Sequence, residues 1–437
     1  MVWYGTEDGK TITLHFWGGV QPEYGYDDLC ANFNEEYKDK GLQVEYVRYV
    51  NDDNGNLQLE TYLMGGGDVD LFIGYGGRTK MDKRVDSNLL LDMSGMLNDI
   101  GFNLDDELGV ANMAEYHYDD GAVYGFPTKY ENSRWILINE DMFKEAGLDI
   151  PYDGWTYSEF LADAEKLTHG EDQDKVYGVC WARKQSGKSI LYALDGVLGA
   201  NQIYKNEEGT EVNFDNDVYR AGFNLVKETL DKGYAIPIED EFSEDISVAN
   251  TFLQGKCAIM LGVAQMRLCM DQENYPHDFT TALVPAPVPD DEKYNTEFYR
   301  KQIGTTGAGD LLSISANTKY PEASFEFAMW YLKGGMSPLV QGGRIPLWNG
   351  VNKDEVLSVL KEKAQGSIDM DSMENYLSLD TTQGVAAIKG HASSEISSAW
   401  FEEFDAMCYG KQSVDQTVQN MEKRGNELIQ TELSSQK

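Results

Sequence analysis

The first 75 residues alternate strand-like and helix-like hydrophobic patterns, and this alternation restricts the fold more than any other feature of the chain. Apolar and polar residues alternate over residues 12–16, which predicts a strand, and residues 26–37 then repeat apolar side chains at helical spacing. A second strand (43–50), a second helix (57–66) and a short buried strand (69–73) follow. This β-α-β-α-β order predicts an α/β fold with a parallel sheet.

Similar signals continue along the rest of the chain. The 437 residues correspond to two or three domains at roughly 150 residues each, and we take two. The prolines gathered in 283–295 predict a rigid connector that crosses between two lobes. The further elements we expect are a strand at 176–182 and helices at 157–167, 217–231, 321–332 and 414–428.

The chain is strongly acidic, with 74 Asp and Glu against 36 Lys and Arg and a formal charge of −38. Nucleic acid is bound mainly by basic side chains that displace counterions, so this balance argues against a nucleic-acid partner. The longest apolar run, residues 257–264, is far shorter than the ~20 residues that cross a bilayer. The chain begins without a basic and apolar leader, so we expect a signal segment to be absent or already removed.

Motifs for metal, nucleotide and covalent chemistry are weak. The five cysteines and five histidines lack the spacing of zinc or redox sites, and no G-x-S-x-G elbow is present. Residues 51–56 (NDDNGN) lack the outer carboxylates of a calcium loop and are interpreted as a turn. Residues 182–189 (ARKQSGKS) fit a relaxed phosphate loop in which Lys188 and Ser189 would hold phosphate and magnesium, but the first glycine is missing. We therefore expect no cofactor, no metal and no catalytic residue, with nucleotide binding left as a minor alternative.

Aromatic residues stand at the ends of predicted strands. Trp17 follows the first strand and precedes Gly18 and Gly19, and Tyr75 stands between two glycines after the third strand. In open α/β sheets, ligands bind at the carboxyl ends of strands. An aromatic face beside carboxylate, amide or guanidinium groups suits a sugar, although such rings also complete cores.

Residues 119–168 resemble the extracellular solute-binding proteins family 1, the carbohydrate-binding subunits of ABC importers. Other segments similar to this family are 252–262 (FLQGKCAIMLG), 313–332 and 410–429, so the resemblance covers most of the chain. The matching positions within 119–168 are Gly121, Tyr124, Gly125, Pro127, Asn139, Ala146, Gly147, Leu148 and Trp155.

The resemblance implies a two-lobe, type II periplasmic-binding-protein-like fold, each lobe a mostly parallel sheet flanked by helices. The chain would cross between lobes near 127–131, in 283–290 and near Gly334. The resulting lobes, both discontinuous, are 1–128 with 286–333 and 129–285 with 334–437. A hinge would close them around a ligand held in the cleft between them.

The resemblance also implies which residues bind the ligand. Gln265 stands where the family often has Trp, which makes Trp348 and Trp400 candidate replacements for a stacking platform. Asp310 ends a glycine-rich segment (304–310) and would accept hydrogen bonds from hydroxyls. The full set of candidate ligand-binding residues is Trp17, Tyr75, Tyr130, Glu131, Asn132, Trp181, Arg183, Gln265, Asp310, Trp348 and Trp400.

The predicted function is an extracytoplasmic receptor, without enzyme activity, that captures a carbohydrate, in particular an oligosaccharide, and passes it to an ABC permease. We expect a monomer in the periplasm or on the cell surface as a lipoprotein, reaching the membrane only through a lipid anchor outside this chain. The alternatives are a receptor for a peptide or polyamine, expected to have a carboxylate-rich site, and a carbohydrate-active enzyme with two carboxylates flanking the sugar.

Overall fold

The computed structural model describes residues 3–51, 53–132, 134–186, 190, 193–194, 197–198, 203–300, 310–378 and 390–435. The chain divides into two compact units. The first consists of Met1–Glu131 and Gly307–Leu360, and the second of Asn132–Thr306 and Lys361–Lys437. Two segments lie in a different unit from the predicted one. Residues 286–300, predicted for the first lobe, lie in the second unit, and residues 334–360, predicted for the second lobe, lie in the first unit.

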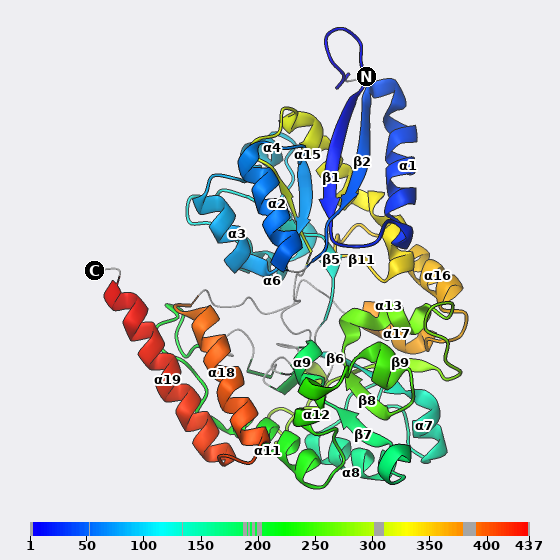
Figure 1. Cartoon of the computed structure of the whole chain (residues 1–437), viewed down its shortest axis with the longest axis vertical. Helices are drawn as coiled ribbons and strands as arrows, with labels where there is room; N and C mark the ends of the chain where they lie inside the picture. The colour runs from blue at the N-terminus through cyan, green and yellow to red at the C-terminus, as the bar shows by residue number, and fades with distance from the viewer. Residues whose placement is uncertain are drawn as a thin grey trace. The chain divides into compact units, whose positions relative to one another are not determined.

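The first unit is built on a sheet with the strand order β2-β1-β3-β10-β4 among the described residues. Figure 1 shows β1 and β2 side by side, with α1 (Tyr26–Tyr37) next to them. Its strands are β1 (Ile12–Gly18), β2 (Leu42–Arg48), β3 (Leu71–Gly74), β4 (Phe126–Pro127) and β10 (Leu311–Ile314). β1 runs parallel to β2 and β3, whereas β10 lies antiparallel between β3 and β4. A separate antiparallel pair joins β5 (Lys129–Tyr130) to β11 (Ile345–Pro346).

Helices cover the faces of this sheet because alternate strand side chains are buried. The Phe16 ring of β1 is fully buried, and its centroid lies 5.1 Å from the Phe327 ring and 5.6 Å from the Tyr331 ring. The helices of the first unit are α1 (Tyr26–Tyr37), α2 (Asp53–Gly65), α3 (Gly77–Asp86), α4 (Ser94–Asp99), α5 (Leu104–Leu108), α6 (Val110–Met113) and α15 (Pro321–Trp330); α16 (Lys353–Ala364) begins in it.

The second unit has a sheet with the order β7-β8-β6-β9 in the described part of the chain (Figure 1). Its strands are β6 (Trp135–Asn139), β7 (Tyr177–Cys180), β8 (Cys257–Leu261) and β9 (Thr281–Pro285), of which β6 runs against the other three. Its helices are α7 (Glu140–Glu145), α8 (Tyr157–Leu167), α9 (Arg183–Ser186), α11 (Asp217–Asp231), α12 (Ile238–Ser243), α13 (Met266–Met270), α14 (Glu297–Arg300), α17 (Met370–Leu377), α18 (Ser393–Cys408) and α19 (Val414–Ser435).

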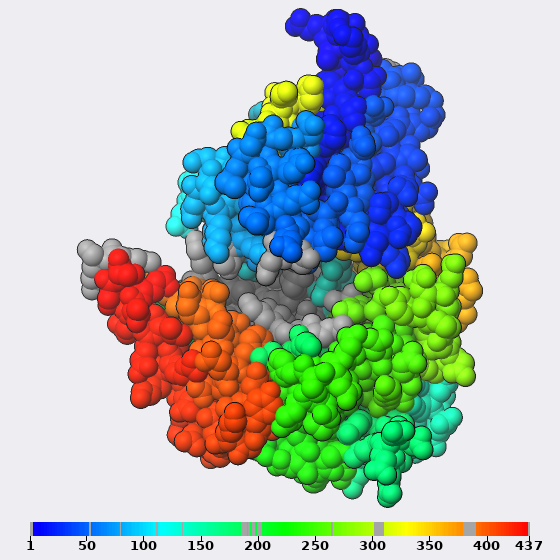
Figure 2. Space-filling model, viewed as in Figure 1, coloured from blue at the N-terminus to red at the C-terminus, as the bar shows by residue number. Residues whose placement is uncertain are grey.

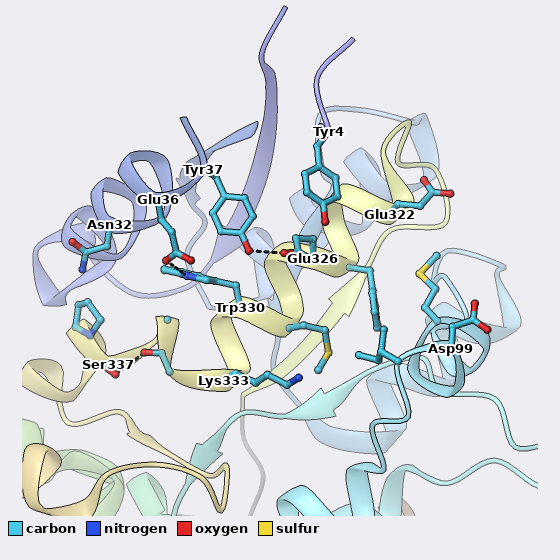
Figure 3. Close-up of a pocket in the computed structure, with 17 residues that line it drawn as sticks. Tyr4, Asn32, Glu36, Tyr37, Asp99, Glu322, Glu326, Trp330, Lys333 and Ser337 are labelled. Carbon is cyan, nitrogen blue, oxygen red and sulfur yellow. Dashed lines mark hydrogen bonds between the residues drawn. The ribbon is translucent and has the colours of Figure 1, made fainter. Parts of the chain in front are cut away.

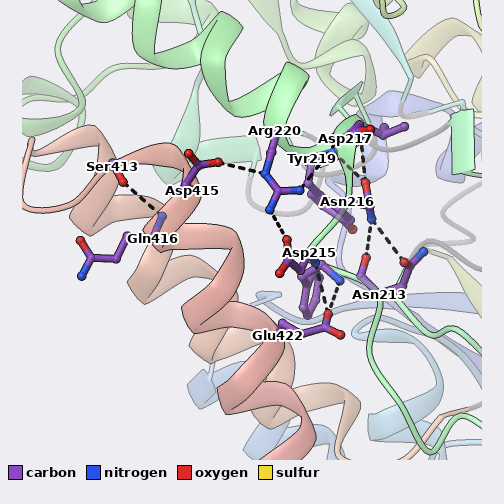
Figure 4. Close-up of polar contacts among 12 residues, drawn as sticks. Asn213, Asp215, Asn216, Asp217, Tyr219, Arg220, Ser413, Asp415, Gln416 and Glu422 are labelled. Carbon is purple, nitrogen blue, oxygen red and sulfur yellow. Dashed lines mark hydrogen bonds and ion pairs between the residues drawn. The ribbon is translucent and has the colours of Figure 1, made fainter.

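The two C-terminal helices close the second unit on one side. Figure 2 shows α18 and α19, orange and red, side by side on its surface. A polar network joins α19 to the N-terminus of α11 (Figure 4): Arg220 Nε donates to Asp415 Oδ1 at 3.0 Å, and Glu422 Oε2 accepts a hydrogen bond from the Phe214 backbone N–H at 2.8 Å. Hydrogen bonds to its side chains therefore hold the C-terminal helix in place, in addition to the packing of its apolar face.

The predicted α/β class with sheets flanked by helices is confirmed, and each sheet contains one reversed strand among the described residues. The interpretation of residues 51–56 as a turn is wrong, because α2 already begins at Asp53. A Cβ at Gly55 would lie 1.8 Å from the Val50 carbonyl oxygen, so glycine lets the first turn of α2 pack tightly against the preceding chain.

Candidate functional site

Four chain segments meet at the carboxyl edge of the first unit's sheet. β1 and β3 end there at Gly18 and Gly74, and the antiparallel β10 begins there. In the register, Leu311 pairs with both Gly74 and Pro127. Asp310 therefore lies at the sheet edge between the residues that follow β3 and those that follow β4, which is the edge where α/β sheets bind ligands.

Four charged side chains form a cluster at this edge, which we call the sheet-edge cluster: Lys129, Glu131, Asp310 and Arg344. Arg344 Nε lies 2.9 Å from Asp310 Oδ2, and Lys129 Nζ lies 2.6 Å from Glu131 Oε2 and 4.0 Å from Asp310 Oδ1. The pairing of β5 with β11 brings Lys129 opposite Pro346, and the same antiparallel register, continued past the strand ends, places Arg344 opposite Glu131. Two cations and two carboxylates thus compensate one another.

The charges of this cluster are fixed by their neighbours. Burial alone would raise the pKa of Asp310, but the positive charges of Arg344 and Lys129 outweigh burial and hold that pKa below its ordinary value. Burial lowers the pKa of Lys129, but Asp310 and Glu131 overcome this and leave it raised. Asp310 and Lys129 are therefore ionised near neutral pH, and the Asp310 carboxylate acts as a hydrogen-bond acceptor.

Tyrosines hold the loop after β1 against the same edge. The Tyr75 hydroxyl accepts a hydrogen bond from the Gly19 N–H at 3.0 Å, and the Tyr46 hydroxyl donates to the Val20 carbonyl at 2.8 Å. Burial, followed by the negative charge of Asp310, raises the pKa of Tyr75 well above its ordinary value. Tyr75 is thus a neutral, half-buried ring beside the sheet-edge cluster.

Trp348 lies in the loop that follows β11 and is half-buried. Its indole N–H donates to Glu107 Oε2 at 2.7 Å, and the Leu347 N–H donates to the Thr128 carbonyl at 2.9 Å. A Cβ at Gly350 would lie 2.2 Å from the Trp348 ring, so the loop folds directly against the indole. Trp348 and Arg344 therefore flank β11 on its two sides, and the backbone beside Trp348 pairs with the segment next to Lys129.

Three predicted tryptophans are packed inside their units. Trp17 is 5 % exposed, and its indole N–H donates to the Asp68 carbonyl at 2.8 Å. Trp181 donates to Thr229 Oγ1 at 3.0 Å, and the Trp400 ring stacks on Phe404 at 4.9 Å. All three are core side chains within the unit to which each belongs.

The other predicted residues are divided between the units. Tyr130 and Glu131 belong to the first unit, although the resemblance implied the second lobe, and Tyr130 is buried in β5. Asn132 begins the second unit and is fully buried, with its N–H donating to the Tyr376 hydroxyl at 3.0 Å. Gln265 is half-buried before α13.

Arg183 forms a two-pronged ion pair inside the second unit. Its Nε and Nη2 atoms lie 2.7 and 2.9 Å from the two oxygens of Asp405, and its guanidinium lies 4.0 Å from the Phe401 ring centroid. Residues 183–186 form α9, whereas Lys188 and Ser189 of the predicted phosphate loop lie outside the described residues.

Sequence reasoning missed Lys129 and Arg344. Arg344 stands four residues before Trp348 in the loop GGRIPLWNG, so a charged residue in an otherwise apolar and glycine-rich segment was a usable signal. No sequence pattern showed that it pairs with Asp310, because that contact depends on β10 entering the sheet between β3 and β4.

The two α/β units, each with a sheet flanked by helices, define the class of two-lobe solute-binding folds. A family model described as bacterial extracellular solute-binding protein matches residues 18–333, which is more than half of the chain. The chain therefore belongs to the bacterial extracellular solute-binding proteins.

Solved structures with the same fold support this class. A sugar transporter protein from Rhizobium etli in an open conformation is 18 % identical with a TM-score of 0.72, covering 95 % of this chain and 99 % of that one. A substrate-binding protein from Listeria monocytogenes in complex with cycloalternan is 18 % identical with a TM-score of 0.68, covering 96 % and 98 %. The cyclic α-maltosyl-1,6-maltose binding protein of Arthrobacter globiformis is 15 % identical with a TM-score of 0.69, covering 96 % and 100 %.

Two features are absent from the described residues. No helix within them is long and apolar enough to span a bilayer. Within the same residues, no three His, Cys, Asp or Glu side chains are grouped so that they could hold a metal ion.

Proposed function

We propose that this chain is an extracytoplasmic receptor that binds a carbohydrate, specifically an oligosaccharide, and delivers it to an ABC permease. The observation that carries the proposal is the family match over residues 18–333. Structures of the same fold support the ligand class, because those from Listeria monocytogenes and Arthrobacter globiformis are named for cycloalternan and a cyclic maltosyl-maltose. We further propose that the receptor acts as a monomer and is attached to the membrane by a lipid anchor.

The sheet-edge cluster supplies the hydrogen bonds in this proposal. Glu131 and Asp310 accept from sugar hydroxyls, and Lys129 and Arg344 donate to hydroxyl oxygens. The side chains of Lys129 and Glu131 remain 14 % and 15 % exposed, so a ligand can reach them without unfolding the edge. Because each charge already has a partner of opposite sign, the cluster recognises a neutral polar ligand without a net charge of its own.

The rings of Tyr75 and Trp348 supply the apolar faces. Both are half-buried and held by hydrogen bonds, so little side-chain entropy is lost when a sugar ring packs on them. Of the predicted residues in the second unit, we keep Gln265 as a proposed contact because it is half-buried rather than enclosed.

We propose binding without turnover. A glycosidase needs a carboxylic acid whose pKa is raised so that it can protonate the leaving group. The pKa of Asp310 is shifted in the opposite direction by Arg344 and Lys129. This carboxylate is therefore suited to accepting hydrogen bonds and not to donating a proton.

The first experiment is a thermal-shift screen against mono- and oligosaccharides, amino acids, peptides, polyamines and MgATP. A ligand that binds only the folded state adds about 2.7 kcal/mol of stability at a hundredfold excess over Kd. We expect a shift for one class of oligosaccharide, with chromatography showing the glycan unchanged afterwards. A shift for amino acids, peptides or MgATP alone, or hydrolysis of the glycan, would contradict the proposal.

Variants then test the site with the glycan found. We expect Glu131→Gln and Trp348→Leu each to weaken binding about tenfold, because each removes a hydrogen-bonding charge or a stacking face. Trp330→Leu is the matched control, since this half-buried tryptophan lies on α15 away from the sheet-edge cluster. Equal losses in all three variants, measured by calorimetry, would refute the assignment of the site.

A further inference from the structure

Trp348 is held by α5, a helix that supplies none of the residues assigned to sugar binding. The Trp348 indole N–H donates to Glu107 Oε2 at 2.7 Å. The next residue is tied to the same helix, because the Asn349 N–H donates to the Glu107 carbonyl at 2.9 Å and Asn349 Nδ2 donates to the Asp106 carbonyl at 2.9 Å. Three hydrogen bonds therefore join two consecutive loop residues to α5.

α5 is itself anchored within the first unit. Its residues Leu104 and Leu108 are buried. The Asn103 side chain caps the helix by accepting a hydrogen bond from the Asp105 N–H at 2.9 Å, and Asp105 Oδ1 lies 2.8 Å from His117 Nε2. Because packing and hydrogen bonds hold α5, its side chains offer fixed acceptors to the loop after β11.

The chain on either side of Trp348 also restricts its ring. A Cβ at Gly350 would lie 2.2 Å from Trp348 Cζ2, so the following residue packs directly against the indole. The preceding residue is fixed by its backbone, since the Leu347 N–H donates to the Thr128 carbonyl at 2.9 Å and the Thr128 N–H donates to the Asp310 carbonyl at 3.1 Å. These backbone bonds connect the loop to a member of the sheet-edge cluster.

We propose that Glu107 is a positioning residue of the sugar site, which fixes the Trp348 indole so that a ring face meets the ligand; this role rests on the proposed function. The indole has a single donor, its N–H, and Glu107 occupies it. Trp348 therefore contributes an apolar face for the C–H side of a sugar ring, and no hydrogen bond to a hydroxyl. A ring that is already fixed loses less side-chain entropy when the sugar binds.

Trp330 provides a matched comparison in the same unit. Its indole N–H donates to Glu36 Oε2 at 2.8 Å, so it is also a half-buried tryptophan held by a glutamate (Figure 3). This pair joins α15 to α1, and neither residue belongs to the sheet-edge cluster or to the loop after β11. Glu36→Ala therefore releases a tryptophan without touching the sugar site.

Titration calorimetry with cycloalternan, or with the oligosaccharide that gives the largest shift in the thermal screen, tests the role of Glu107. We expect Glu107→Ala to weaken binding about fivefold and Glu107→Gln only about twofold, because an amide oxygen still accepts from the indole. Glu36→Ala is the control and is expected to have no effect. The double variant Glu107→Ala/Trp348→Leu is expected to bind as weakly as Trp348→Leu alone, since Glu107 acts through that ring.

The indole N–H signal of Trp348 gives a readout that needs no ligand. In ¹⁵N-labelled protein, the signal is identified by its loss in Trp348→Leu. We expect it to shift and to exchange faster with solvent in Glu107→Ala, and to change little in Glu107→Gln. The thermal midpoint of every variant is measured first. If Glu107→Ala unfolds, Gly350→Ala displaces the ring without altering Glu107 and is expected to weaken binding to the same extent.

Four outcomes would overturn the proposal. They are unchanged binding in Glu107→Ala, equal weakening by Glu107→Gln, equal weakening by Glu36→Ala, and additive losses in the double variant, which would show that Glu107 acts independently of Trp348. Each of these outcomes refutes the positioning role while oligosaccharide binding by the unsubstituted protein stands. If no oligosaccharide binds although the indole signal responds as expected, the proposed function fails, and the ligand role of Glu107 fails with it.

Discussion

Glu241 is a carboxyl group on α12 with no exposed surface. Its Oε2 accepts a hydrogen bond from the Lys184 N–H at 3.2 Å, and its Oε1 lies 3.9 Å from the Cys180 sulfur. Burial raises the pKa of Glu241 to about 7, although neighbouring backbone N–H groups and Arg183 oppose the shift. The folded protein therefore holds a proton on Glu241 at a pH where the unfolded chain has lost it.

This difference predicts a pH-dependent stability. Since the folded pKa is above the unfolded value of about 4.3, the contribution of Glu241 is fully present below pH 4 and is lost as the pH rises through about 7. We measure the free energy of unfolding in urea at pH 5 and at pH 8. Between these two pH values, we expect the free energy of unfolding of Glu241→Gln to rise by roughly 3 kcal/mol relative to that of the unsubstituted protein. Glu239→Gln on the exposed face of α12 is the control. A stability difference that stays constant over this range would show that Glu241 is ionised throughout.

Single residues also show how far the site could be predicted. The sequence pattern predicts Tyr75 because this residue follows a predicted strand, whereas Glu131, Asp310 and Trp348 are implied by the family resemblance. The structure places Glu131 and Asp310 in the sheet-edge cluster and Trp348 in the loop after β11. The same reasoning cannot separate Trp17, which donates inward to Asp68, from an exposed ring at a strand end. Arg183 also follows a predicted strand, yet its guanidinium is bound by Asp405. That partner stands 222 residues away in the sequence, so the sequence pattern could not reveal it.

At the scale of the element, α8 shows which local signals determine a helix. Its bounds, Tyr157–Leu167, agree with the predicted helix, as do those of α11. Thr156 and Glu159 form a capping box, in which the Thr156 N–H donates to Glu159 Oε2 at 2.7 Å and the Glu159 N–H donates to Thr156 Oγ1 at 3.4 Å. The apolar residues on the other face, such as Phe160 and Ala164, are buried.

The capping box predicts a measurable effect on stability. We expect Thr156→Ala to reduce the free energy of unfolding by about 1 kcal/mol, because a backbone N–H at the start of α8 loses its acceptor. Lys166→Ala, on the exposed face of the same helix, is expected to change it by less than about 0.5 kcal/mol. Chemical unfolding of both variants compares them, and equal losses would mean that the cap contributes nothing beyond an ordinary surface side chain.

Elements defined by distant partners could not be predicted in the same way. The pattern of the first 75 residues predicted β1, β2 and β3 and the helices between them. The place of β10 between β3 and β4 has no local signal, since its four residues are all buried and read equally well as part of a helix. Gly55 also misled the prediction, because a glycine within a polar run is typical of a turn, but here it lies in the first turn of α2.

At the scale of the whole molecule, the formal charge of −38 affects stability through self-repulsion. Salt shortens the screening length from about 30 Å at 0.01 M to about 3 Å at 1 M. We therefore expect the thermal midpoint to rise by a few degrees between 0.01 and 0.5 M NaCl, measured by scanning calorimetry. KCl should give the same rise, and an unchanged or lower midpoint in both salts would indicate that favourable ion pairs outweigh the repulsion.

The placement of β10 also affects the order in which the molecule is assembled. β3 ends at Gly74, but the strand that pairs with its free edge begins at Leu311. A ribosome must therefore synthesise most of the chain before the first sheet can acquire its antiparallel neighbour, and all of the second unit's strands are made in the interval. Such distant pairing slows folding and keeps a strand edge unpaired in the growing polypeptide. Synthesis of the N-terminal unit therefore begins first, but its sheet is complete only after the strands of the second unit have been made.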